Sequence, residues 1–167
     1  VALGIGSVHA MAGPEVSSAE DLVDLQALAA AEPGPRVLGY WGELAERGGL
    51  ALVRELGLAG AGGDLFCDGA FGSHTAALSA PYSDRSDTSG ALRFETASLV
   101  DHVRACTQAS IQAGFHCIGD AAVKQVLDAV GTVVAELGTA AVRVCRHRLE
   151  HLEMVDDADL ARMSAWG

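Results

Sequence analysis

The sequence predicts an α/β fold with a parallel sheet, and two observations favour it. Short apolar segments typical of strands alternate with segments in which apolar residues recur at helical spacing. Glycine, proline or helix-capping residues separate most of these segments. Strands that alternate with helices pair in parallel through right-handed crossovers. The alternation is compatible with a doubly wound sheet and, equally, with part of a (β/α)8 barrel, whose complete form needs about 250 residues.

Five strands are expected along the chain. In chain order they occupy residues 3–9, 36–41, 64–68, 115–118 and 142–151. The first helix is expected to begin with Ser17 as its N-cap and Glu20 as its capping-box partner. A second helix, around residues 50–56, is expected to end at Gly57.

Three more helices are expected in the second half of the chain. Residues 98–113 carry one apolar face, and Gly114 follows them as a C-terminal stop. The clearest helix covers residues 120–137 and is closed by Gly138. A last helix is expected after a cap at residues 156–157.

A long segment without periodicity, residues 69–94, is expected to be a loop. Loops of this length inside compact domains are usually functional or disordered. Within it, His74 and Thr75 are candidate substrate contacts, although a purely structural role in the loop fits them equally well.

Composition argues against several classes of protein. The net charge of −11 disfavours binding to nucleic acid or to anionic membrane surfaces. No apolar run approaches the roughly 20 residues that span a bilayer, and no basic segment precedes an apolar stretch as in a signal peptide. The four cysteines form no CxxC pair and are expected to be buried reduced thiols, which fits the cytoplasm: Cys67, Cys106, Cys117 and Cys145.

Two histidines are the leading candidates for chemistry. His116 and His151 each lie at the end of an expected strand and are followed by a helix. Parallel strands place their C-terminal ends on one face, and imidazole is the commonest metal ligand among side chains. The pair therefore predicts a metal site across neighbouring strands. The alternative for each is a core histidine that is hydrogen-bonded to the backbone.

Two aspartates support the same interpretation. Asp64 and Asp68 share one face of the strand expected at residues 64–68. Buried carboxylates are costly unless a metal or hydrogen-bonding groups compensate them. Asp64 is a candidate metal ligand and Asp68 a candidate substrate contact. For Asp68 the alternative is an ordinary turn before Gly69.

The other histidines are weaker candidates. His147 is expected to be structural and His102 to lie on the surface of a helix. His9 could face the site, or make a hydrogen bond in a turn. No glycine-rich nucleotide motif follows a strand and no GxSxG elbow is present, so nucleotide binding and serine hydrolysis are weakly supported.

Three ordered motifs resemble those of a known enzyme family. They are Asp68-Gly-Ala-Phe-Gly-Ser-His-Thr-Ala-Ala77 with Pro81-Tyr82, then His116-Cys-Ile-Gly-Asp120 with Ala122-Val123, and then Arg146-His-Arg-Leu-Glu-His151. The opening Gly6-Ser-Val-His-Ala-Met-Ala-Gly-Pro14 is similar too. Through these motifs essentially the whole chain resembles amidohydrolase family 3, the YtcJ-like metal-dependent hydrolases.

The resemblance implies a partial (β/α)8 TIM barrel of the metal-dependent hydrolase type, about strands two to six with their helices. Residues 1–167 would then form a single partial barrel domain that lacks the first strand, the last two strands and a small β-domain. Family members take a His-x-His pair from the first strand and an aspartate, the usual base, from the eighth. This chain begins at Val1 and has no His-x-His pair, so its ends look cut.

The resemblance also implies a divalent metal, with zinc expected. His116 and His151 match the metal-binding histidines of the fifth and sixth strands. Asp64 matches the fourth-strand position where many relatives carry a lysine. Because Lys124 is the only lysine and lies in an expected helix, Asp64 would have to ligate as a carboxylate itself. The number of bound metal ions, one or two, stays open.

The function implied is hydrolysis of non-peptide C–N bonds, of amide or N-formyl type, in small-molecule substrates by a metal-activated water. Without the missing parts, this chain alone is expected to be weak or inactive. A non-catalytic alternative is a truncated α/β segment that self-associates as a homo-oligomer, because an open half-barrel exposes strand edges and apolar surface. A third alternative is a flavodoxin-like binding module.

Overall fold

The computed structural model describes residues 3–167. The strands are β1 (Ser7–Ala12), β2 (Arg36–Trp41), β3 (Gly60–Ala61), β4 (Gln112–Cys117) and β5 (Arg148–His151). The helices are α1 (Ala19–Ala31), α2 (Gly49–Glu55), α3 (Thr96–Gln108), α4 (Asp120–Leu137), α5 (Thr139–Cys145) and α6 (Asp157–Trp166), with short 3-10 turns η1 (Ala45–Arg47) and η2 (Phe71–Ser73). Across the described range, no helix combines the length and apolar character that crossing a bilayer requires.

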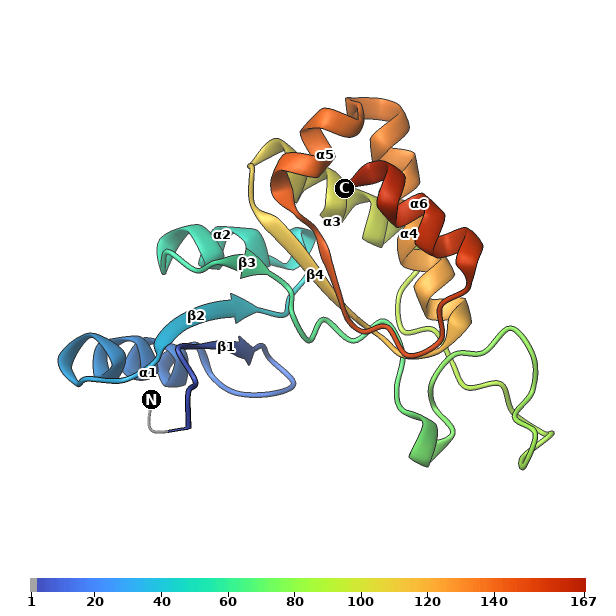
Figure 1. Ribbon diagram of the computed structural model, residues 1–167, viewed down its shortest axis with the longest axis horizontal. Helices are drawn as coiled ribbons and strands as arrows, with labels where there is room; N and C mark the ends of the chain where they lie inside the picture. Colours follow the sequence, from blue (N-terminus) through green and yellow to red (C-terminus); the bar gives the residue numbers. More distant parts are fainter. Residues whose placement is uncertain (1–2) are drawn as a thin grey trace.

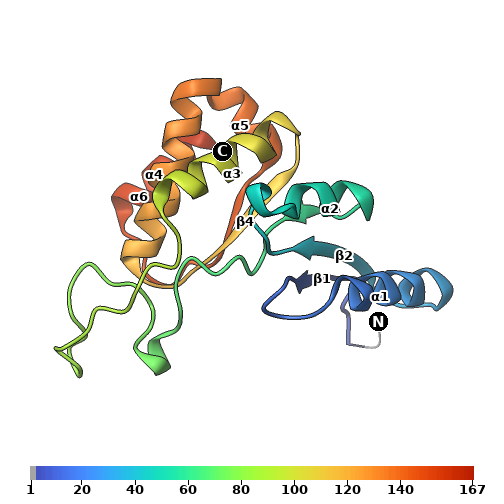
Figure 2. The same cartoon turned by 180° about the vertical axis from the view of Figure 1, so that it is seen from behind.

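All five strands belong to one parallel sheet, and their order in the sheet is their order in the chain. The sheet is curved, with β1 and α1 at one end of the molecule and α3 to α6 gathered at the other (Figures 1 and 2). A doubly wound sheet would reverse its strand order at some point, whereas a barrel keeps it. The prediction of a partial (β/α)8 barrel is therefore confirmed.

The core lies between the sheet and the helices. On β4, Phe115 and Cys117 point to this side and are fully buried. The apolar faces of α3 and α4 cover them, through Leu99, Val103, Val123 and Val126. Because these side chains recur at helical spacing, the sequence pattern of both helices leads directly to this packing.

The prediction of a strand at residues 64–68 is wrong, and the glycine run before these residues is the reason. β3 contains only Gly60 and Ala61. Gly62 and Gly63 adopt φ values of +123° and +92°, and a Cβ on Gly62 would lie 2.0 Å from the carbonyl oxygen of Gly114. The chain therefore leaves the sheet here. Downstream, Phe66 alone forms a bridge, to His116 of β4.

The strand expected at residues 142–151 is correct only in its second part. Residues 139–145 form α5, on which Val142 and Cys145 are buried three residues apart. Valine suits strands, but here packing against α3 and α4 favours the helix. Arg146 then adopts a left-handed φ of 53°, which ends α5 before β5 begins.

Smaller shifts affect other boundaries. β1 lies several residues later than expected. The capping box of α1 uses Ser18 and Asp21, one residue later than predicted, with reciprocal bonds of 3.1 and 3.0 Å. α3 stops at Gln108, where Ser110 turns the chain with a φ of 55°, and Gly114 lies inside β4 instead of ending the helix.

On the other side of the sheet, Arg148 links strands that are not neighbours. Its Nη1 donates a hydrogen bond to Nδ1 of His9 at 2.7 Å, and its guanidinium lies 5.2 Å from the ring centre of Tyr40. Its Nη2 donates to Glu150 at 2.8 Å. Because three strands separate β1 from β5, this contact spans the concave inner side and helps to hold the curvature of the sheet.

Candidate metal centre

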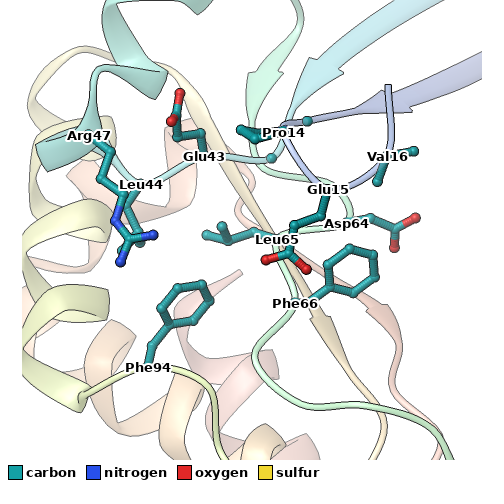
Figure 3. Close-up of a pocket in the computed structure, with 12 residues that line it drawn as sticks. Pro14, Glu15, Val16, Glu43, Leu44, Arg47, Asp64, Leu65, Phe66 and Phe94 are labelled. Atoms are coloured by element: carbon teal, nitrogen blue, oxygen red, sulfur yellow. The ribbon is translucent and has the colours of Figure 1, made fainter. Parts of the chain in front are cut away.

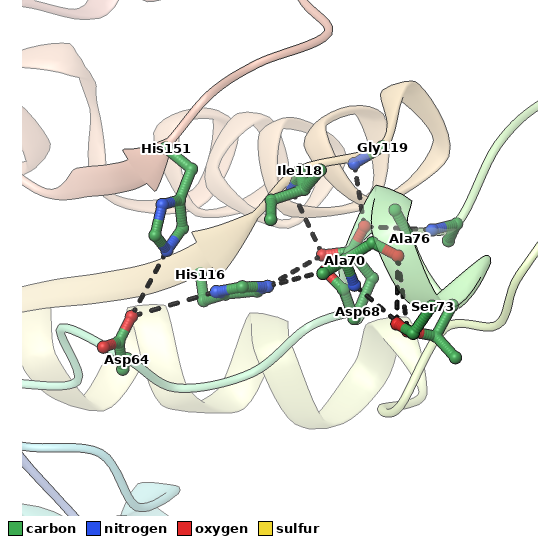
Figure 4. Close-up of polar contacts among 12 residues, drawn as sticks. Asp64, Asp68, Ala70, Ser73, Ala76, His116, Ile118, Gly119 and His151 are labelled. Carbon is green, nitrogen blue, oxygen red and sulfur yellow. Dashed lines mark hydrogen bonds and ion pairs between the residues drawn. The ribbon is translucent and has the colours of Figure 1, made fainter.

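Three predicted site residues come together where strands end (Figure 4). His116 is the penultimate residue of β4, His151 ends β5, and Asp64 follows β3. The Asp64 Oδ1 atom lies 3.8 Å from Nδ1 of His116 and 3.5 Å from Nε2 of His151. One ligand atom from each residue lies within 4.8 Å of the other two. Ligand atoms around one tetrahedral zinc are roughly 3.4 Å apart, so small movements would complete such a site.

The hydrogen bonds of His116 fix which nitrogen is available. Its Nε2 lies 2.9 Å from the carbonyl oxygen of Gly69 and 3.5 Å from Oδ1 of Asp68. Both neighbours only accept, so Nε2 carries the proton and Nδ1 of the neutral ring carries a lone pair. That Nδ1 is buried and has no hydrogen-bond partner. A buried acceptor without a partner is unfavourable, and a cation held with Asp64 would satisfy it.

The backbone at His151 is held in an uncommon conformation. His151 and Leu152 have φ values of 67° and 51°, in the left-handed region that residues other than glycine rarely adopt. A hydrogen bond of 3.0 Å from the Leu152 amide to the Cys117 carbonyl holds this turn against β4. Such strain tends to persist at functional sites. Here it directs the His151 ring toward Asp64, while 40% of the side chain stays exposed.

Asp68 has a different environment from Asp64. Its side chain is fully buried, and its carboxylate accepts hydrogen bonds from the amides of Ala77, Ile118 and Gly119 at 2.9, 3.1 and 2.8 Å. The carboxylate thereby ties the loop to the start of α4. Direct contact between Asp68 and substrate stays a prediction.

The expected loop at residues 69–94 contains only the turn η2, and hydrogen bonds from the Ala121 amide to the Ala77 carbonyl and from the Ser79 amide to Asp120 tie part of it to the start of α4. The rest of the loop extends away from the helices in both views (Figures 1 and 2).

His74 has a left-handed φ of 55°, and its Nε2 lies 3.0 Å from Asp84, which lowers the pKa of that carboxyl. The Thr75 hydroxyl accepts from the Ala70 amide at 3.0 Å. Both residues stay candidates for substrate contact.

A cleft opens beside Asp64 (Figure 3). It encloses about 100 Å³ between the segments that follow β1, β2 and β3. Asp64 and Phe66 form one wall, and Arg47 and Phe94 lie opposite. The Phe66 ring packs edge-on against His116, with 5.0 Å between ring centres. The cleft therefore adjoins Asp64 directly, and Phe66 separates it from His116.

Three other histidines, His9, His102 and His147, make structural contacts. The expectation that His102 lies on the surface is wrong, because its side chain is 1% exposed. Its Nδ1 accepts from the Ala45 amide at 3.0 Å, and burial lowers its pKa to about 4. His147 accepts from the Ala113 amide at 2.9 Å, as expected of a structural residue. His9 contacts Arg148 and stacks on Tyr40. None of these three histidines belongs to the group of Asp64, His116 and His151, here called the triad.

The cysteines have no role in the candidate site. All four are buried and unpaired, which confirms the prediction of buried thiols. Burial raises the pKa of Cys106 to about 12, so its thiol stays protonated at neutral pH.

Sequence reasoning gave no role to Phe66 or Arg47, which line the cleft. The spacing does place Phe66 on the same side of its segment as Asp64 and Asp68. Arg47 carries no motif, and only the folded arrangement of η1 brings it to the cleft.

Comparison with known proteins agrees with the fold. Residues 1–167 match a family model described as "Amidohydrolase family". A curated relative from Bacillus subtilis (strain 168), named "Putative amidohydrolase YtcJ", is 31% identical over 99 residues, which cover 59% of this chain and 17% of that protein.

Two solved structures are similar over almost the whole chain. Both are described as uncharacterized metal-dependent hydrolases, from Pyrococcus furiosus and Pyrococcus horikoshii OT3. Each has a TM-score of 0.71, with 28% and 27% identity, and the alignments cover 99% of this chain. They cover 33% and 32% of those proteins, so the chain spans about a third of their length.

Proposed function

The chain belongs to the amidohydrolase family, and we propose that Asp64, His116 and His151 form the divalent metal site of a hydrolase, with zinc as the expected ion. The observation that carries the proposal is the buried Nδ1 of His116, which has no partner and lies beside Asp64. Two imidazoles and a carboxylate are a donor set typical of catalytic zinc sites, which keep one position open. The exposed side of His151 is where that position would be reached.

The chain's own groups would orient this site. Bound zinc supplies a Lewis acid and lowers the pKa of a water toward about 7. The Gly69 carbonyl holds the Nε2 proton of His116, which turns Nδ1 toward Asp64. Asp64 contributes the negative charge at the position where many family members carry a lysine. Asp68 acts indirectly, because it fixes the loop that contains Gly69.

The proposed reaction is hydrolysis of a non-peptide C–N bond, of amide or N-formyl type, in a small molecule. The family, the donor set and the printed descriptions of the solved relatives as metal-dependent hydrolases support it. His74 and Thr75 are the proposed substrate contacts in the loop.

We also propose that the chain is the central part of the barrel, about strands two to six. The coverage of about a third of the solved relatives supports this. The general base and any further metal ligands would then come from other strands, and this chain alone would have weak or no activity.

Titration of the metal-free chain with zinc chloride, followed calorimetrically, tests the metal site. We expect one ion per chain, and a loss of affinity of roughly 100-fold in His151→Asn. Asparagine tolerates the left-handed backbone at this position, so the fold should survive, which circular dichroism would verify. His74→Asn is the matched control, because His74 has a similar backbone but lies outside the triad. Failure of the parent chain to bind zinc, or equal loss in both variants, would contradict the proposal.

A second candidate function, self-association without catalysis, is favoured by the groove between the β1 edge and α1. Val8, Leu25 and Leu28 are exposed large apolar residues there. A second copy of the chain packed on this groove would bury them. Sedimentation equilibrium would reveal a dimer that Leu28→Glu dissociates. A parent chain that stays monomeric at every concentration would rule this function out.

A further inference from the structure

Phe66 packs against His116, one of the three proposed metal ligands, although phenylalanine itself offers no ligand atom. The two residues form an isolated parallel bridge, because the His116 amide donates to the Leu65 carbonyl at 2.9 Å and the Cys67 amide donates to the His116 carbonyl at 3.1 Å. Their side chains therefore lie on the same face of the sheet. The ring centres are 5.0 Å apart and the ring planes meet at 64°, so the rings touch edge to face.

The orientation of the His116 ring decides whether Nδ1 is available to an ion. Its Nε2 points to the Gly69 carbonyl at 2.9 Å, and Nδ1 then faces Asp64 (Figure 4). Half a turn about the Cβ–Cγ bond would carry Nδ1 away from Asp64. The His151 ring also packs on His116, with 4.5 Å between centres, but it lies at the exposed rim. Phe66, whose backbone is held by the bridge, is therefore the neighbour that limits this rotation.

Arg93 in turn holds the ring of Phe66. Its guanidinium lies over that ring, with Cζ 5.6 Å from the ring centre, and a cation over an aromatic face is attracted by the ring. The Arg93 amide donates to the Cys67 carbonyl at 2.9 Å, which fixes the backbone beside the ring. At the other end, Nη2 forms an ion pair of 3.0 Å with Glu15, in the segment after β1. Arg93 is thus held at both ends while it covers Phe66.

The ion pair between Arg93 and Glu15 is exposed, with 45% and 61% of the two side chains accessible. Exposed ion pairs contribute little to the stability of a fold. Loss of the pair should therefore disturb the position of the Phe66 ring more than the free energy of unfolding.

We propose that Phe66 is a positioning residue for His116, because its ring keeps Nδ1 turned toward Asp64. Arg93, paired with Glu15, keeps the Phe66 ring in place. These contacts connect the segment after β1 to a metal ligand on β4. The inference rests on the proposed metal site, since the orientation of Nδ1 has a use only there.

Long-range proton–nitrogen NMR of the metal-free chain at pH 8 tests the orientation without any ion. In the parent chain we expect one tautomer of His116, with the proton on Nε2, and nuclear Overhauser contacts between the Phe66 and His116 rings. In Phe66→Leu the His116 ring should populate both tautomers, so its two nitrogen shifts should move toward each other. Zinc affinity, measured by calorimetric titration, should fall about tenfold.

Phe94→Leu is the matched control. It removes the same atoms from a second half-buried phenylalanine, and among the described residues Phe94 packs against no imidazole ring. It should leave the nitrogen shifts of His116 and the zinc affinity unchanged.

Arg93→Met tests the second contact, and it does not endanger the fold because the side chain is exposed. The nitrogen shifts of His116 should move in the same direction as in Phe66→Leu, and zinc affinity should fall about threefold. Arg85→Met also removes an exposed arginine from an ion pair and should change neither quantity.

Three results would overturn the role of Phe66: a single Nε2-protonated tautomer in Phe66→Leu, an equal change in Phe94→Leu, or a parent chain without the Overhauser contacts. Unchanged nitrogen shifts in Arg93→Met would overturn the role of Arg93. A parent chain that takes up no zinc overturns the metal site, whereas the metal-free spectra decide the positioning of the ring, so the two failures are distinguishable.

Discussion

Asp64 and Asp68 lie four residues apart on one segment, yet their surroundings are opposite in kind. The carboxylate of Asp68 is fully buried and accepts three backbone hydrogen bonds. The carboxylate of Asp64 is partly exposed and faces two imidazoles at 3.5 and 3.8 Å. The first anion is satisfied by the protein itself, whereas the second lies among groups that a cation would complete.

The same contrast separates two histidines. His102 uses both ring nitrogens within the core, since Nδ1 accepts from Ala45 and Nε2 lies 3.4 Å from the Ala61 carbonyl. His116 uses only Nε2, and its buried Nδ1 has no partner. Both ring nitrogens of His102 therefore serve the fold, whereas Nδ1 of His116, which lies beside Asp64, is left to accept a ligand.

Removal of the Asp68 carboxylate should have the largest effect on stability. In Asp68→Ala three buried amides lose their acceptor, so we expect the free energy of unfolding to fall by about 4 kcal/mol. Urea denaturation of the metal-free chain measures it. Asp87→Ala, which removes a carboxylate that is 73% exposed, should change it by less than about 0.5 kcal/mol. A loss below about 1 kcal/mol for Asp68→Ala would remove the distinction between the two aspartates.

Low pH should destabilise the fold through protonation of His102. Burial lowers the pKa of His102 from 6.5 to about 4. The unfolded chain therefore takes up a proton at a higher pH than the folded chain. The contribution to stability is complete above pH 6.5 and is lost as pH falls toward 4, by about 3 kcal/mol.

His102→Asn isolates this contribution, because an asparagine oxygen can still accept from the Ala45 amide. Urea denaturation at several pH values should show a shallower fall in stability for the variant between pH 6.5 and 4. Parallel curves for the parent chain and the variant would mean that His102 does not carry the acid sensitivity.

Replacement of Asp64 should affect zinc affinity more than stability, which is the opposite of the effect expected for Asp68. Asp64→Asn should lower the affinity for zinc by roughly 100-fold, yet change the stability of the metal-free chain by less than about 1 kcal/mol, because Asp64 accepts no hydrogen bond from the described residues. Calorimetric titration and urea denaturation measure the two quantities. Asp24→Asn, on the exposed side of α1, is the charge-matched control. A large loss of stability of the metal-free Asp64→Asn variant would mean that Asp64, like Asp68, supports the fold.

The smallest effect is expected from the contact across the inner side of the sheet. His9→Leu removes the acceptor for Arg148 and should lower stability by about 1 kcal/mol. Zinc affinity should stay within about threefold, because β1 contributes no residue to the triad. A larger loss of zinc affinity in the same calorimetric titration would mean that the positions of Asp64, His116 and His151 depend on the His9–Arg148 contact.

Much of the fold was predictable from the sequence where local signals agreed with packing. The bounds of β2 match the expected residues 36–41, and α4 ends at Leu137 with Gly138 as its C-cap, as its apolar stripe and closing glycine indicate. The pairing of His116 and His151 followed from their placement at successive strand ends, whereas Asp64 joined them through its carboxylate and the family resemblance, although the strand expected to begin at Asp64 is absent. These features depend on short-range patterns and on the general geometry of parallel sheets.

Other features depend on contacts between distant parts of the chain. β3 is a glycine–alanine pair without strand-like character, and it pairs because its neighbours lie on both sides. His102 is buried because η1, 57 residues earlier, supplies its partner. The amides that hold Asp68 come from positions 9 to 51 residues away. No local pattern encodes such pairings.

The central claim is that Nδ1 of His116 is a metal ligand, and nitrogen NMR of the imidazole rings tests it most directly. On addition of one equivalent of zinc to the labelled chain, the resonances of His116 Nδ1 and His151 Nε2 should take metal-bound shifts, while His116 Nε2 keeps its proton toward Gly69. Rings that show no change with zinc, or coordination of His116 through Nε2, would contradict the account.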